Sequence, residues 1–221
     1  MINRLYFILI IGGLILSGCQ KKQVQLPLID VPGISEIQNH SSIWIFLETN
    51  NGKTYAKLNK NNKILNTHWI FNIDRGLSMN QVIPLLQKMQ ENRNKDSMHK
   101  KEGMKNYFSY ADTAAEKISL SPFSQTTFLM ISRDGEEELP ESCTVILEIF
   151  GDRIKLNNEV LALNSLEEML QESDLCDPGK DLKILLAYDG ETSFQDYLTT
   201  KVFLQANELS TSSVEYVYTV K

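Results

Sequence analysis

Two stretches of the chain carry one pattern of apolar and polar positions. Residues 183–205 (KILLAYDGETSFQDYLTTKVFLQ) begin with an apolar run, turn at Asp189-Gly190, and end in apolar residues that recur every three or four positions. This pattern predicts a strand, a tight turn and a helix that begins after Ser193. Residues 69–92 (WIFNIDRGLSMNQVIPLLQKMQEN) are related, with Asp74 at the place of Asp189. We therefore expect an internal repeat.

Strands are predicted around both stretches. Runs of β-branched and aromatic residues flank the turn sequences Asn51-Gly52 and Gly151-Asp152, as in β-hairpins. Strands are expected at 42–48, 54–58, 127–132, 144–150, 153–156 and 213–220. The predicted fold class is α+β, with two small units, each a β-hairpin plus strand–helix–strand, and a sheet covered by helices.

The N-terminus has the layout of a secretory signal. Arg4 precedes an apolar run over 5–16, and Leu16-Ser17-Gly18-Cys19 follows it. Twelve apolar residues fall short of the ~20 that span a bilayer. The tetrapeptide resembles a bacterial lipobox, which implies cleavage before Cys19 and lipidation of that residue, with acyl chains such as palmitate as the anchor.

The chain then divides into four parts. Residues 1–18 are a predicted lipoprotein signal peptide, and residues 19–40 a lipid-anchored linker without sustained periodicity. Residues 41–135 form a first unit with a polar insertion at 92–105, and residues 136–221 form a second unit. Gln20 follows the lipobox where an Asp would indicate retention in the inner membrane, so we expect the outer membrane, facing the periplasm.

Composition and charge narrow the class of function. The chain has 221 residues, of which 42% are apolar and 23% charged, as in ordinary globular proteins. Its net charge of −6 gives no basis for binding nucleic acid. After the predicted cleavage, Cys143 and Cys176 remain in an oxidising compartment, where they either form a disulfide or stay as two buried thiols.

The sequence contains no recognisable catalytic or metal motif. No Gly-rich phosphate loop, paired histidine motif or Cys-x-x-Cys is present, so no cofactor or metal is expected. Asp74 and Asp189 end strands where ligands often bind in αβ sheets, although an Asx-turn is the favoured explanation for both. Ser78 and Ser193 are expected to be helix caps rather than nucleophiles.

The second unit resembles the periplasmic domain of the ExbD/TolR biopolymer-transport family. The matching segments are 144-TVILEIFGDRIKLNNEVL-161, 165-SLEEML-170, 184-ILLAYDGETSF-194 and 214-VEYVYTV-220. The resemblance implies a periplasmic module that dimerises and contacts envelope partners. The family's membrane helix with its acidic residue has no counterpart, because the first acidic residue here is Asp30, after the lipobox.

We therefore expect a non-enzymatic lipoprotein of the cell envelope that acts as a binding or scaffold module. Its expected partners are an ExbB/ExbD/TonB-type or Tol-type transport complex, or peptidoglycan. The two units are expected to pair as an intramolecular pseudo-dimer, or the chain as a homodimer. The alternatives are a small-ligand-binding lipoprotein and an envelope hydrolase.

Overall fold

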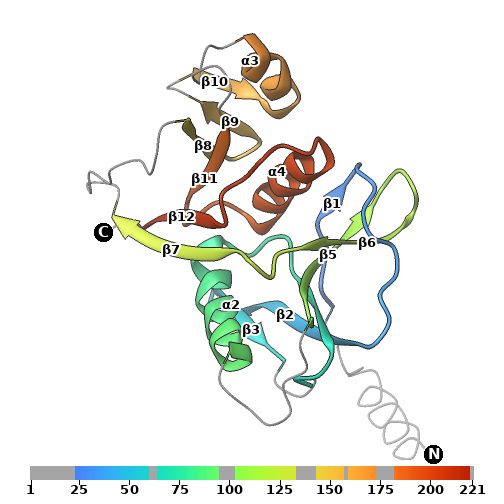
Figure 1. Ribbon diagram of the computed structural model, residues 1–221. Coiled ribbons are helices and arrows are strands. Elements are labelled where there is room, and N and C mark those ends of the chain that lie inside the picture. Colours follow the sequence, from blue (N-terminus) through green and yellow to red (C-terminus); the bar gives the residue numbers. More distant parts are fainter. Residues whose placement is uncertain are drawn as a thin grey trace, which may run out of the picture.

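The structure is a computed structural model that describes residues 23–59, 64–94, 103–132, 143–156, 159–172 and 182–219. The described part is mostly β-sheet, arranged as two six-stranded mixed sheets with helices packed against them (Figure 1). Within these ranges, no helix combines the length and the apolar character needed to cross a membrane.

The first sheet has the strand order β1-β5-β4-β2-β3, and β6 pairs with β5 along residues 107–112. Strands β2, β4 and β5 are parallel, whereas β3 and β6 run antiparallel to their partners. Asn51 and Gly52, with φ of 50° and 75°, form the predicted hairpin turn between β2 and β3. The strands are β1 (Leu28–Ile29), β2 (His40–Asn50), β3 (Lys53–Leu58), β4 (His68–Ile73), β5 (Asn106–Asp112) and β6 (Lys117–Pro122).

The second sheet has the strand order β10-β9-β8-β11-β12-β7. Its centre is parallel: β11 pairs with β8 on one side and β12 on the other, and β12 pairs with β7. Strand β11 is buried along five consecutive residues, as its continuous apolar run predicts. The strands are β7 (Thr127–Ser132), β8 (Thr144–Phe150), β9 (Arg153–Leu156), β10 (Glu159–Ala162), β11 (Lys183–Asp189) and β12 (Val214–Thr219).

Helices α2 (Met79–Asn94) and α4 (Phe194–Ala206) bury their apolar stripes in one core that both sheets share. This core contains residues of the first sheet such as Phe71, residues of the second sheet such as Tyr188, and residues of both helices. A second cluster lies between the second sheet, α4 and the short helix α3 (Leu166–Glu172). The two sheets therefore share part of their hydrophobic stabilisation.

The turns before α2 and α4 pair with each other. Met79 N donates to Thr192 O at 2.9 Å, and Phe194 N donates to Leu77 O at 2.8 Å. The two donors are 115 positions apart (194 − 79), as are the two acceptors (192 − 77). The bonds Asn80 N to Gly190 O and Gln195 N to Arg75 O repeat the same offset. The stretches with the repeated pattern are thus in direct, reciprocal contact.

The predicted fold of two small hairpin-plus-helix units is wrong. Each sheet has six strands, and β7, which was expected in the first unit, pairs with β12 in the second sheet. The physical reason is that this pairing joins strands far apart in the chain, and the local pattern of each segment does not specify its partner. Strand β7 covers the edge of β12, and β1 and β6 cover that of β5.

Residues 23–40 differ from the expected tether. Strand β1 pairs with β5, Ile29 is 3% exposed, and Ile34 exchanges backbone hydrogen bonds with Leu120. Burial of Ile29 and Val31 against the core explains why this stretch lies on the body of the protein. Most of the predicted polar insertion, residues 95–102, lies outside the described residues.

Candidate functional site

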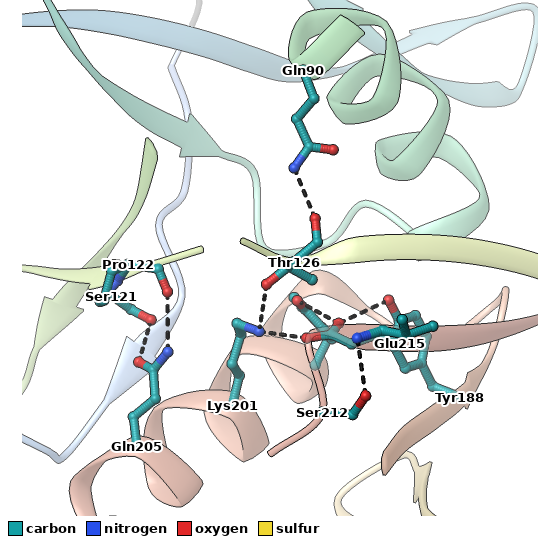
Figure 2. A network of polar contacts seen from close by, with 11 residues as sticks. Gln90, Ser121, Pro122, Thr126, Tyr188, Lys201, Gln205, Ser212 and Glu215 are labelled. Carbon is teal, nitrogen blue, oxygen red and sulfur yellow. Dashed lines mark hydrogen bonds and ion pairs between the residues drawn. The ribbon is translucent and has the colours of Figure 1, made fainter. Parts of the chain in front are cut away.

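A lysine lies in the buried stripe of helix α4. Lys201 is 7% exposed, because it follows Tyr197 by four positions and so shares its face of the helix. Its Nζ forms an ion pair with Glu215 Oε1 on β12 and donates to Thr126 Oγ1 at 3.2 Å (Figure 2).

Glu215 is 1% exposed, and both of its carboxylate oxygens are occupied. Oε1 accepts from Lys201, while Oε2 accepts from the Tyr197 hydroxyl at 2.9 Å and the Tyr188 hydroxyl at 3.4 Å. Burial, and then the negative charge of Glu215, raises the pKa of both tyrosines well above its ordinary value. Both phenols therefore remain protonated donors at neutral pH.

This buried network orders the structure. An isolated buried charge is costly, and here the lysine and the carboxylate compensate each other, with three hydroxyl groups completing their hydrogen bonds. A lysine without a nearby charge and a carboxylate with a free oxygen would be candidates for proton transfer, but neither condition is met. The network instead ties α4 to β12 and to Thr126.

Helices α4 and α2 both hold residues 122–126, where the chain leaves β6 and continues to β7. Gln205 of α4 donates to Pro122 O at 3.1 Å and accepts from the Ser121 hydroxyl at 2.6 Å. Gln90 of α2 donates to Thr126 O at 3.0 Å from the other side (Figure 2). Side chains of both helices thus fix the backbone where the chain passes from one sheet to the other.

A cavity of about 340 Å³ lies beside this segment, against α4. We call it the α4 cavity. Its described lining is rich in hydroxyl and amide groups, includes Lys105 and Lys201, and contains no carboxylate. The remaining lining residues are Pro122, Phe123, Ser124, Gln125, Thr126, Gln205, Thr211, Ser212 and Ser213.

A larger cavity of about 680 Å³, the α2 cavity, lies against helix α2 and shares Ser124 and Thr126 with the α4 cavity. Its lining combines one buried cation, Arg93, with amide groups and apolar side chains. Glu91, at the surface, is the acidic residue in its described lining. Together, the two cavities border residues 122–128 on both sides.

The two aspartates predicted as turn or ligand positions lie in the paired turns. Asp74 Oδ1 accepts from Gly76 N at 3.0 Å, and Asp189 Oδ1 accepts from Glu191 N at 2.9 Å. Each carboxylate thus closes an Asx-turn by accepting from the backbone N–H two positions further on. The second oxygen of Asp74 accepts from Gln25 N. Neither residue lines the cavities described above.

Ser193 and Cys143, which the sequence also singled out, do not line either cavity. Ser193 caps α4 by accepting from Asp196 N, as the sequence predicts. Cys143 is disulfide-bonded, whereas Cys19 and Cys176 lie outside the described residues. The described ranges contain no cluster of His, Cys, Asp and Glu that could hold a metal ion.

Sequence reasoning missed Lys201, Glu215 and Arg93. Two of them had a visible signal. Lys201 falls within the helical stripe of Phe194, Tyr197 and Val202, and Glu215 alternates with Val217 along a strand.

The chain was compared with protein-family models, with curated proteins and with solved structures, and it matches none of them.

Proposed function

We propose that this chain is a lipid-anchored protein of the bacterial cell envelope that binds peptidoglycan in the cavities beside residues 122–128. The observation that carries the proposal is the lining of the α4 cavity, which combines hydroxyl and amide groups with the exposed Lys105 and the ion-paired Lys201 and includes no carboxylate. Peptidoglycan offers matching hydroxyl, amide and carboxylate groups. Sites for such ligands are concave and position a few polar groups for orientation.

Electrostatics supports an anionic ligand at this position. The whole chain carries a net charge of −6, so most of its surface repels anions. Lys201 is compensated by Glu215, whereas Lys105 is exposed at the rim of the α4 cavity. The cavity is therefore a local exception to the acidic character of the chain.

The lipid anchor places the site near its ligand. Cys19 is the proposed site of lipidation, on the strength of the lipobox. The proposal predicts that a radiolabelled or clickable palmitate analogue is incorporated in cells and that Cys19→Ala abolishes incorporation. Labelling of the Cys19→Ala variant at the level of the unaltered chain would contradict the anchor.

Co-sedimentation with purified peptidoglycan sacculi tests the binding function. Lys105→Glu places a carboxylate at the rim of the cavity and should lower the bound fraction several-fold. Lys183→Glu makes the same charge change at an exposed lysine of β11 that does not line either cavity, and should bind like the unaltered chain. Equal binding of the two variants would contradict a site in the α4 cavity.

A second candidate function is contact with a transport complex of the ExbD/TolR type, favoured by strand β7. Among the described strands it stands last in the order of the second sheet; it contains no charged residue and exposes Leu129 at 41% and Met130 at 43%. The exposed apolar side chains of this strand offer an envelope protein a surface on which to pack. A photo-crosslinking residue at position 130, introduced in cells, should capture such a partner; crosslinks to nothing but lipid would contradict this function.

A further inference from the structure

Arg93 is a buried cation whose hydrogen-bond partners are all neutral. It lies in the last turn of α2, is 9% exposed, and places its guanidinium carbon 3.9 Å from the centre of the Trp69 ring. Its amino groups donate to three oxygens: Lys105 O, Asn106 Oδ1 and Thr67 O. Two are backbone carbonyls and one is an amide oxygen.

The positive charge of Arg93 therefore lacks a compensating anion in the described structure. No carboxylate forms an ion pair with it there, and its Nε has no hydrogen-bond partner. Burial lowers the pKa of Arg93 to about 10, so the side chain remains charged at neutral pH. A guanidinium forms its strongest hydrogen bonds with carboxylate and phosphate.

Arg93 lines the α2 cavity together with groups that suit a carboxylate. Asn106, whose Oδ1 accepts from Arg93, and Ser124, which is exposed, supply an amide and a hydroxyl beside it. Met104 and Phe128 give the cavity an apolar side. A volume of about 680 Å³ is in the range of small-molecule sites.

The one acid of the lining limits the charge of the ligand. Glu91 is exposed at the cavity and repels a second anionic group. The lining thus offers one buried cation for one anion, apolar surface for a small side chain, and repulsion of further negative charge.

We propose that the α2 cavity binds the terminal carboxylate of a short peptide that ends in a small apolar residue. Arg93 attracts the carboxylate, Asn106 and Ser124 donate to it, and the last side chain packs against Met104 and Phe128. This inference rests on the proposed function, since it assigns the peptide part of the cell-wall ligand to the α2 cavity.

Titration calorimetry with N-acetyl-alanyl-alanine and its C-terminal amide tests the proposal on the full chain in detergent. The acid should bind, and the amide about tenfold more weakly or not at all, because it cannot form the charge-assisted hydrogen bonds. Phosphate added as a competitor distinguishes a peptide site from a general anion site: it should not displace the peptide at equal concentration.

A matched pair of variants locates the site. Met104→Glu puts a carboxylate into the cavity without removing a hydrogen bond of Arg93, and should weaken binding of the acid about tenfold. Met130→Glu makes the same change on the exposed edge of β7 and should stay within about twofold of the unaltered chain.

Three results would overturn the carboxylate site: no binding of the acid, equal binding of acid and amide, or equal behaviour of the two Met→Glu variants. The proposed function has a separate readout, because sacculus binding depends on Lys105 in the α4 cavity. If Lys105→Glu binds sacculi as well as the unaltered chain does, while the peptide still binds, the proposed function is contradicted and the carboxylate site remains.

Discussion

Lys201 and Arg93 are both buried cations, with 7% and 9% of their surface exposed, yet their surroundings differ in kind. Lys201 has a carboxylate partner, Glu215, and a hydroxyl partner, Thr126. Arg93 has carbonyl and amide oxygens and an aromatic ring. The first cation is neutralised within the fold, whereas the second keeps its charge beside a cavity.

The comparison teaches how a buried cation can be read for function. A compensated pair is costly to break but has no charge left to attract a ligand. A cation held by dipoles alone retains an attraction for anions, and its burial strengthens that attraction because the surrounding dielectric is low. Burial therefore does not separate a structural cation from a binding one; the formal charge of its partners does.

The largest expected effect is that of Lys201→Met. The substitution leaves Glu215 as an unpaired buried charge, so the free energy of unfolding should fall by about 3–5 kcal/mol in urea titrations. The double variant Lys201→Met/Glu215→Leu removes both charges and should recover part of this loss. A loss below about 1 kcal/mol for Lys201→Met would contradict the role of the ion pair.

A smaller loss of stability is expected for Arg93→Met. This change removes the donor from three oxygens but leaves no uncompensated charge, so unfolding should become easier by about 2–3 kcal/mol. Measured in the same urea titrations, the loss must be smaller than that of Lys201→Met. Equal losses would remove the energetic distinction between the two cations.

The tyrosines of the Lys201 network should make stability fall steeply at alkaline pH. The folded state raises the pKa of Tyr188 and Tyr197, so above pH ~10 the unfolded chain releases these protons while the folded chain retains them. Each tyrosine then lowers stability by about 1.4 kcal/mol per pH unit. Tyr197→Phe should remove one such contribution, as measured by urea unfolding at several pH values.

An exposed tyrosine provides the control for this pH dependence. Tyr55 is 40% exposed on β3, which belongs to the first sheet, whereas the strands of the Lys201 network belong to the second. Tyr55→Phe should change the alkaline slope less than Tyr197→Phe does, because the Tyr55 hydroxyl, which donates to Glu48, lies at the surface. If Tyr197→Phe and Tyr55→Phe gave the same slope, proton retention by the buried phenol would not explain the fall.

The smallest expected effect is that of Thr126→Val. It removes the hydroxyl that accepts from Lys201 and keeps Glu215, so stability should fall by about 1 kcal/mol. Thr127→Val changes the neighbouring exposed residue and should stay within about 0.5 kcal/mol of the unaltered chain. Chemical unfolding distinguishes the two, and equal values would show that the hydroxyl contributes nothing to holding Lys201.

Local elements could be predicted from the sequence, and the reasons are local. The hairpin at Asn51-Gly52, the cap at Ser193 and the stripe of α4 depend on residues a few positions apart, so their patterns are visible along the chain. Helix α2 could likewise be predicted from the spacing of its apolar residues.

Long-range pairing could not be predicted in the same way. Strands β7 and β12 pair in parallel although their residues, such as Thr127 and Val214, lie far apart in the sequence. Nothing in either segment specifies the other, because both are short strands whose patterns fit many neighbours. The α2 cavity depends on Arg93, whose isolated position near a polar stretch resembles a solvated surface charge.

The parallel pairing of β7 with β12 also has a consequence for the order of events during folding. Strand β7 is synthesised well before β12, which is its neighbour in the sheet. Until β12 arrives, the uncharged segment TFLMIS has no strand on which to dock. Such a segment is prone to aggregate while it waits, so a newly synthesised chain should need protection by a chaperone until residues 214–219 have been made.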